Sequence, residues 1–146
     1  MKRKFKILSL NISEKKGEQK IPVSKAVLKI DYGIVGDAHA GNWHRQISLL
    51  ANEDIESMQG NGIDLNYGDF AENITTEGVM LHELPIGTRL NIDNTILEIT
   101  QIGKECHHGC AIYAAVGDCV MPRRGIFAKV IVQGEISNES SCYYNI

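Results

Sequence analysis

The chain has little of what membrane-spanning, secreted and nucleic-acid-binding proteins need. Its apolar runs are only a few residues long, as in Ile126-Phe127-Ala128, whereas a membrane-spanning helix needs roughly 20 apolar residues. The basic start, Met1-Lys2-Arg3-Lys4, is not followed by the apolar core of a signal peptide. The net charge is −3, so there is no basic excess to neutralise phosphates. We therefore expect a cytoplasmic protein that binds neither membranes nor nucleic acids.

Signs of disorder and of a second domain are also missing. Hydrophobic residues make up 43% of the 146 residues and charged residues 23%, close to the averages of soluble globular proteins. No repeat, low-complexity tract or Pro/Gly/Ser-rich linker divides the sequence. We expect a single domain over 1–146, with a core over about 5–134 and a polar, peripheral tail over 135–146 that includes Cys142.

Helix signals are few. Asn52 can cap a short helix whose first turn contains Glu53 and Asp54, where carboxylates suit the helix dipole. Gly60 would end that helix. A second short helix is predicted from about Cys110 to Val116, with the following glycine as its end. Two short helices leave most of this chain to strands and loops.

Apolar and polar residues alternate over most of the remaining segments, as they do in half-buried strands. The alternation predicts strands over 4–7, 25–31, 45–50, 88–92, 95–102 and 126–133. Asp93-Asn94 separates two of these strands and predicts a tight hairpin. So many strands need protection of their edges. We therefore predict a mainly β fold, a closed or strongly curved β-barrel with a few short helices.

A glycine-rich loop over 33–41 is the first candidate for a binding site. It holds Asp37 and His39, whose side chains can orient each other or bind an anion and its proton. Glycines let the backbone approach a ligand closely; a structured turn with a surface histidine is the alternative. Arg45 follows near the start of a predicted strand, where its planar fork can hold phosphate or carboxylate or face solvent.

Two more polar stretches can supply ligand groups. Glu72 and Asn73 lie in a polar loop before a strand. They can offer an acceptor and an amide to a ligand, or they can satisfy backbone groups of the loop. Arg123 and Arg124 open the last long strand, where adjacent arginines can hold a phosphate. A solvated turn explains these two arginines equally well.

The cysteines carry the most informative chemistry. The chain has four, of which Cys106, Cys110 and Cys119 lie close together in the sequence. The segment from Cys106 to Cys110 contains two histidines and precedes a predicted helix N-terminus, and both settings lower the pKa of a thiol. Cys106 or Cys110 can therefore be a nucleophile, a sulfur acceptor or a soft-metal ligand. A structural zinc site, for which the spacing fits poorly, and buried structural cysteines are the alternatives.

Four of these motifs together resemble the MOSC domain, the C-terminal domain of molybdenum cofactor sulfurases. They occur in the family's order and spacing: GDAHAG at 36–41, RQISLL at 45–50, GDFAENITTEG at 68–78 and LPIGTRL at 84–90. The resemblance runs over about 5–134 and is to the stand-alone bacterial members. It implies a β-rich, barrel-like fold, which agrees with the strand pattern.

The resemblance also implies chemistry with the molybdenum cofactor. The family's cysteine is thought to carry sulfur or to ligate molybdenum. It matches Cys106 if the preceding strand continues without a gap, and Cys110 if the second of two close cysteines is used. The residues expected to line the site for the molybdenum-pterin cofactor are Asp37, His39, Arg45, Glu72, Asn73, Arg123 and Arg124.

Related members pass sulfur to a molybdenum centre or reduce N-hydroxylated substrates, and the resemblance implies one of these activities. Its partner would be a molybdoenzyme or a protein of cofactor biosynthesis; a non-catalytic module that delivers the cofactor is the alternative. Ile102–Glu105 replace the family's Pro-Arg-x-Pro, and Ala71 replaces a glycine. Lys104, with Arg123 and Arg124, can replace the lost positive charge. Pyridoxal phosphate, which the full sulfurases bind in a separate domain, is not expected to bind this chain alone.

Overall fold

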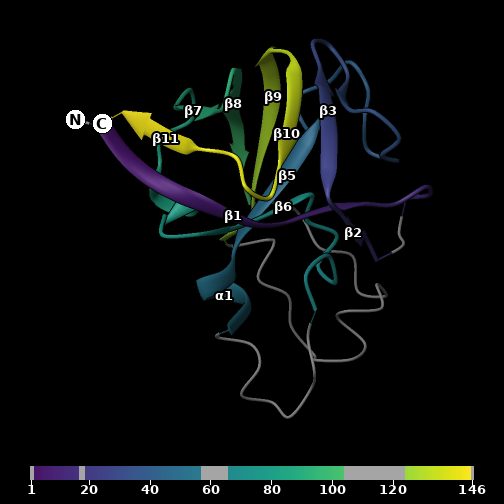
Figure 1. Cartoon of the computed structure of the whole chain (residues 1–146), viewed down its shortest axis with the longest axis horizontal. Helices are drawn as coiled ribbons and strands as arrows, with labels where there is room; N and C mark the ends of the chain where they lie inside the picture. The colour runs from purple at the N-terminus through teal and green to yellow at the C-terminus, as the bar shows by residue number, and fades with distance from the viewer. Residues whose placement is uncertain (1, 17–18, 57–65, 104–123, 146) are drawn as a thin grey trace.

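Strands dominate the computed structural model, which describes residues 2–16, 19–56, 66–103 and 124–145 (Figure 1). The strands are β1 (Lys2–Ile12), β2 (Ile21–Val23), β3 (Lys25–Lys29), β4 (Gly33–Ile34), β5 (Ile47–Ala51), β6 (Ile74–Glu77), β7 (Arg89–Ile92), β8 (Thr95–Ile102), β9 (Ile126–Val132), β10 (Gly134–Ser137) and β11 (Cys142–Asn145). The helical segments in the described ranges are α1 (Asn52–Glu56) and the 3-10 turn η2 (Leu81–Glu83). The prediction of a mainly β fold is confirmed.

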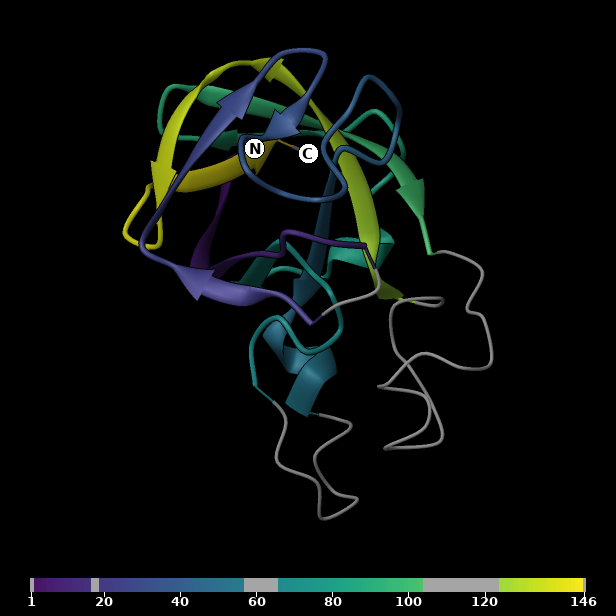
Figure 2. The same ribbon diagram turned by 90° about the vertical axis from the view of Figure 1, so that its right-hand side faces the viewer.

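Seven strands close into a barrel (Figure 2). Their order is β11–β7–β8–β9–β5–β6–β1, and β1 pairs again with β11 to complete the ring. Six of these seven pairings are antiparallel, and only β5–β6 is parallel. β2 pairs with the far end of β1, while β3 lies between β10 and β4 in a separate three-stranded sheet. The predicted closed barrel, which protects strand edges by pairing them, is therefore confirmed.

The inward faces of the strands form one apolar cluster. Members with no exposed area are Leu10, Ile47, Leu49, Ile74, Leu81, Leu90, Ile92, Leu97, Ile126 and Ala128. Removing such a side chain from water is worth about 1.5–3 kcal/mol. The alternation of apolar and polar residues therefore determines which face of each strand points into the barrel.

The predicted hairpin is present between β7 and β8. Leu90 pairs with Leu97, and Ile92 pairs with Thr95, so the two strands run antiparallel in tight register. Asp93 adopts a left-handed backbone conformation with φ of 52°, which Asp tolerates better than most residues. The Thr95 hydroxyl donates to the Ile92 carbonyl oxygen at 2.7 Å and braces the turn.

The predicted helix at Asn52 is present as α1, which spans five residues. Ile55 anchors it to the protein with 1% of its side chain exposed. The expected end at Gly60 and the second expected helix at 110–116 lie outside the described residues. Over the part of the chain that the structure describes, no helix is long and apolar enough to cross a bilayer.

The prediction of a peripheral tail over 135–146 is wrong. β10 pairs with β3, and β11 fills the place between β1 and β7 in the ring. Cys142 is 4% exposed and belongs to the core cluster. The sequence signal is weak because β11 is only four residues long and its tyrosines, Tyr143 and Tyr144, are half-buried. Such a strand has too few residues to display a clear alternation.

Candidate functional site

A buried ion pair lies next to the glycine-rich loop. Lys20 Nζ is 2.7 Å from Asp37 Oδ1, and neither side chain has any exposed area. The same ammonium lies 3.1 Å from Ser13 Oγ and 3.0 Å from His39 Nδ1. Asp37 also accepts the backbone N–H groups of Ser13 and His39, each at 3.1 Å. Lys20 thus contacts the side chains of both Asp37 and His39, and Asp37 also accepts the His39 backbone N–H.

Lys20 shifts the ionisation of Asp37. Burial raises the pKa of this carboxyl, but the hydrogen bond and positive charge of Lys20 outweigh burial, with help from Ser13 and Asn73. The pKa of Asp37 therefore lies below its ordinary value. A buried ion pair offsets its desolvation only when further hydrogen bonds complete it. Here the ammonium also lies within hydrogen-bond distance of Ser13 Oγ and His39 Nδ1.

Sequence reasoning missed Lys20. A single lysine ahead of a short strand reads as a solvated residue, since lysine is almost never fully buried unless it is paired. Its partners lie in other segments: Ser13 follows β1, and Asp37 lies in the loop after β4. The one available signal was the lone acid in the glycine-rich loop, which requires a cation if it is buried.

Asn73 was predicted to bind a ligand. In the structure its side chain forms hydrogen bonds with other residues of the protein. It has no exposed area. Its Oδ1 accepts the backbone N–H of Ser48 at 2.9 Å, and its Nδ2 donates to the Asn11 carbonyl oxygen at 3.1 Å. Its side chain also reaches Asp37. Asn73 therefore joins β1, the start of β5 and the glycine-rich loop.

Glu72 likewise has no exposed area and holds its own loop together. Its carboxylate accepts the N–H groups of Gly68 and Phe70 at 3.0 and 3.2 Å and the Thr75 hydroxyl at 2.8 Å. Burial raises the pKa of this carboxyl, although those hydrogen bonds pull it down. Of the two interpretations offered for Glu72 and Asn73, satisfaction of loop groups describes what both side chains do in this structure.

Arg45 lies against the end of β8. Its Nε donates to Gln101 Oε1 at 3.1 Å, and its guanidinium carbon is 5.2 Å from the centre of the Phe127 ring. His44 Nε2 lies 3.0 Å from the same Gln101 oxygen. Gln101 Nε2 in turn donates to the Gly103 carbonyl oxygen at 2.7 Å. Arg45 is therefore linked through Gln101 to Gly103, the last described residue before 104–123.

The structure places the predicted site residues in different surroundings. Asp37 and His39 both contact Lys20, and Asn73 bonds to Ser48 and Asn11. Arg124 instead donates to Asp54 in α1 at 3.0 Å, with 48% of its side chain exposed. Arg45 and Glu72 have the contacts given above, and Cys106, Cys110, Arg123 and Lys104 lie outside the described ranges. Within the described ranges, no group of three or more His, Cys, Asp or Glu side chains is arranged to hold a metal ion.

The described residues on either side of 104–123 lie close together. The Gly103 N–H donates to the Gly125 carbonyl oxygen at 2.6 Å, and Ile102 pairs with Ile126. A path of contacts runs from Lys20 to this point: Trp43 Nε1 donates to the His39 carbonyl oxygen at 2.9 Å, and His44 follows Trp43 in the chain. The residues just after the glycine-rich loop, His44 and Arg45, thus contact Gln101, two positions before Gly103.

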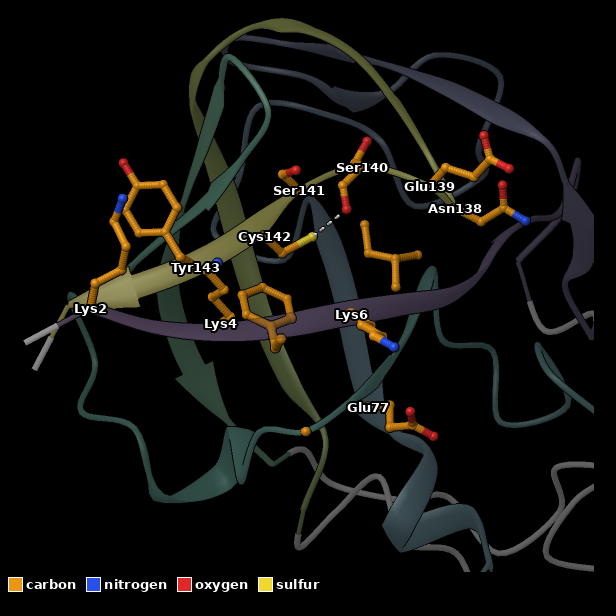
Figure 3. Close-up of a pocket in the computed structure, with 13 residues that line it drawn as sticks. Lys2, Lys4, Lys6, Glu77, Asn138, Glu139, Ser140, Ser141, Cys142 and Tyr143 are labelled. Carbon is orange, nitrogen blue, oxygen red and sulfur yellow. Dashed lines mark hydrogen bonds between the residues drawn. The ribbon is translucent and has the colours of Figure 1, made fainter.

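A separate hollow of about 730 Å³ lies over β1 and residues 138–143 (Figure 3). Lys4 and Lys6 stand on one side of it and Glu139 on the other, and none of the predicted site residues lines it. Cys142 is in its wall. Burial, with the negative charge of Asp93, raises the pKa of the Cys142 thiol to about 12. Cys142 is therefore a poor nucleophile near neutral pH.

Comparisons with known proteins place the fold and the family. A family model described as the MOSC domain matches residues 36–142. A search of the curated proteins finds no match. Among solved structures, the YuaD protein from Bacillus subtilis is similar, with a TM-score of 0.81 and 18% identity over 99% of this chain and 97% of that chain.

Two further solved structures have the same fold. YiiM from Geobacillus stearothermophilus has a TM-score of 0.72 and 16% identity over 97% of this chain and 75% of that chain. YiiM from Escherichia coli has a TM-score of 0.72 and 14% identity, with coverage of 99% and 70%. At such low identity these likenesses show the fold alone.

Proposed function

Because this chain belongs to the MOSC domain family, we propose that it handles the molybdenum cofactor through a cysteine thiolate, Cys106 or Cys110. That thiolate either carries a sulfane sulfur or ligates molybdenum. A molybdoenzyme or a protein of cofactor biosynthesis would be the partner. The observation that carries the proposal is the contact of Arg45 and His44 with Gln101, two residues before Gly103.

This contact supports the proposal by its position in the chain. Cys106 lies three residues beyond Gly103, whose backbone is held on both sides by Gln101 and Gly125. A three-residue extension spans at most about 10 Å. The chain therefore enters 104–123 from Gly103, which is bonded to Gln101, the residue that Arg45 and His44 contact.

The described residues differ in how well they suit such a cofactor. Arg45 is half-buried and carries a planar cation, which suits the phosphate of a pterin cofactor. His39 is half-buried, and its Nδ1 faces Lys20. Glu72 and Asn73 support the site from behind, since their polar atoms bond within the protein.

The proposed function requires little chemistry from the chain's own residues. When bound, the cofactor supplies a redox-active molybdenum centre. The chain supplies a thiolate, which can accept the outer sulfur of a persulfide donor while the donor's thiolate leaves. The guanidinium of Arg45 would favour both a thiolate and a phosphate nearby, because opposite charges at close range stabilise each other. No step requires Asp37, which acts on His39 and on the loop backbone.

Metal and pterin analysis tests the proposal. The chain would be purified from cells with intact cofactor synthesis, as wild type and as Cys106→Ser, Cys110→Ser and the double variant. Cys142→Ala is the matched control, because it removes a thiol outside the proposed site. We expect molybdenum and pterin with the wild type and the control, and neither with the double variant.

Two other results would contradict the proposal. One tightly held zinc per chain without molybdenum would favour the zinc-stabilised domain. If the double variant retained molybdenum and pterin, neither Cys106 nor Cys110 would be needed to bind the cofactor. A persulfide assay on the same samples separates a sulfur carrier from a module that only binds the cofactor, since only the carrier loses a persulfide when its cysteine is replaced.

A further inference from the structure

We infer that Gln101 is a positioning residue, which holds Arg45 so that the end of its guanidinium is presented to an oxyanion. The inference deepens the proposed function and rests on it for the natural ligand, which would be the phosphate of the cofactor. The geometry itself involves only described residues of β8, β9 and the segment before β5. Inorganic phosphate is therefore a sufficient probe.

A β-bulge in β8 brings Gln101 to the outer face of the barrel. Ile99 pairs with Ala128 and Gln101 pairs with Phe127, so Thr100 is an extra residue between the two pairs. In a regular strand, Gln101 would face the barrel interior as Ile99 does, because residues two apart share a face. A bulge re-aims the side chains that follow it. Gln101 therefore lies on the same face as its partner, Phe127.

Phe127 is the floor on which Arg45 lies. Its neighbours in β9, Ile126 and Ala128, belong to the core cluster, so the Phe127 side chain points away from the barrel interior. Phe127 is nevertheless only 7% exposed. The guanidinium carbon of Arg45 is 5.2 Å from the centre of its ring, a distance at which the ring face attracts a cation. The ring thus supports the guanidinium from one side.

The side-chain amide of Gln101 is fixed from both of its ends. Its Nε2 donates at 2.7 Å to the Gly103 carbonyl oxygen, which can only accept. Its Oε1 accepts at 3.1 Å from Arg45 Nε, which can only donate. Exchanging the amide oxygen and nitrogen would place acceptor against acceptor at Gly103 and donor against donor at Arg45. The oxygen of Gln101 therefore faces Arg45.

His44 shares this oxygen. Its Nε2 lies 3.0 Å from Gln101 Oε1, and the two lone pairs of an amide oxygen can accept from His44 and Arg45 together. The backbone of His44 is held as well, because the Thr100 hydroxyl donates to its carbonyl oxygen. The residue inserted by the bulge and the residue after it therefore both fasten the segment that carries Arg45.

The end of Arg45 matches an oxyanion. Its Nε is engaged by Gln101, while its two terminal nitrogens form no hydrogen bond or ion pair with another described residue. A guanidinium is planar, and its parallel N–H groups bind two oxygens of a phosphate at once. Arg45 is half-buried, and reduced contact with water strengthens its attraction for an anion. A phosphate group is the ligand class that this arrangement fits.

Nitrogen NMR of the arginine side chains tests the positioning. In the metal-free protein, the Arg45 Nε–H signal would be identified by its loss in Arg45→Lys, and we expect it to be protected from exchange with solvent. Gln101→Met keeps the length of the side chain and removes the acceptor, so this protection should fall several-fold. Gln133→Met is the matched control, because Gln133 is exposed and its oxygen contacts the Ile30 N–H at 3.4 Å. Unchanged protection in a folded Gln101→Met protein would overturn the role of Gln101.

Titration with inorganic phosphate tests the ligand class. Phosphate should shift the Arg45 Nε–H signal of the wild type and of Gln133→Met equally, and Gln101→Met should weaken binding several-fold. Gln101→Glu keeps an acceptor for Arg45 Nε but adds a negative charge, so it should retain the protection from exchange and lose the phosphate effect. The absence of a phosphate effect in the wild type, or an equal effect of chloride at the same ionic strength, would overturn the assigned ligand class.

The link to the natural ligand has its own readout. In protein purified from cells with intact cofactor synthesis, Gln101→Met should carry several-fold less molybdenum and pterin than Gln133→Met. Equal contents would overturn the assignment of the cofactor's phosphate to Arg45. A wild type that binds phosphate as expected but carries neither molybdenum nor pterin would contradict the proposed function and would support the oxyanion site by itself.

Discussion

Asp37 shows how one buried carboxylate couples the candidate site to stability. Its pKa in the folded protein lies below the ordinary 3.8 because of Lys20. A lowered pKa means that the ionised form contributes stability above the unfolded value, and that this contribution is lost as pH falls through the folded value. The Lys20–Asp37 pair should therefore contribute its full stabilisation at neutral pH, and this contribution should decrease as the pH falls below 3.8.

We predict that Asp37→Asn lowers the free energy of unfolding by about 3 to 5 kcal/mol near neutral pH, because it leaves a buried ammonium without its counter-charge. The deficit relative to wild type should shrink as pH falls below 3.8. Urea unfolding at several pH values measures both effects. Glu135→Gln is the control, since its pair with Lys25 is exposed at 3.8 Å and is worth little. A deficit that stays constant into acid would contradict this account.

Ala71 carries backbone strain that the family's usual glycine would not. Its φ is 62°, the left-handed region that disfavours a Cβ. We predict that Ala71→Gly raises the free energy of unfolding by about 1 kcal/mol. Asp93→Gly, at φ 52°, should gain less because the Asp93 carboxylate accepts the Ser141 N–H at 2.9 Å. A loss of stability in Ala71→Gly would refute the strain argument.

Individual residues of the site were predictable from the sequence only in part. Asp37 and His39 were identified because an acid and a histidine in a glycine-rich loop are an unusual combination. Lys20 was not, because its burial depends on loops that come together only in the fold. Gln101 was missed for the same reason, since it bonds to Arg45 across 56 positions of sequence.

At the scale of elements, the loop before β6 is fastened to the segment before β2. The Lys20 N–H donates to the Gly68 carbonyl oxygen at 3.0 Å. Gly68 has φ of 90°, and a Cβ there would overlap the Lys20 carbonyl oxygen. This close approach requires a glycine at position 68. It holds the backbone of Lys20, whose side chain pairs with Asp37.

We predict that Gly68→Ala destabilises the protein more than Gly87→Ala. Gly87 has a similar φ of 95°, but nothing lies within 4 Å of a Cβ placed there. Gly87→Ala should therefore cost only the backbone strain, about 1 to 2 kcal/mol. Gly68→Ala should lower the free energy of unfolding by more than this and should also change the NMR signals of His39. Equal losses measured by urea unfolding would mean that the contact with Lys20 is easily relieved.

Elements with enough alternating residues were predictable, and short ones were not. The β7–β8 hairpin has strands of four and eight residues around an Asp-Asn turn, so the pattern and the turn agree. β4 has two residues and β2 has three, which is too few to show any period. β11 escaped prediction although it closes the ring, because its place depends on β1 and β7 at distant positions.

At the scale of the whole molecule, the barrel brings together what the sequence separates. β11, from the end of the chain, pairs with β1 from its beginning, and this pairing buries Cys142. The fold also places His44 and Arg45 against Gln101, which bonds to Gly103 at the boundary of 104–123. The fold thus places Cys142 in the core, while Cys106 and Cys110 lie outside the described residues.

Timed alkylation of the folded, metal-free protein, with the labelled cysteines mapped by mass spectrometry, tests the central claim most directly. Near neutral pH we predict that Cys106 or Cys110 reacts first. Cys142 should remain unlabelled until urea unfolds the barrel, because it is 4% exposed and its pKa is about 12. If Cys142 is labelled in the folded protein while Cys106 and Cys110 stay unmodified, the proposed thiolate chemistry loses its basis.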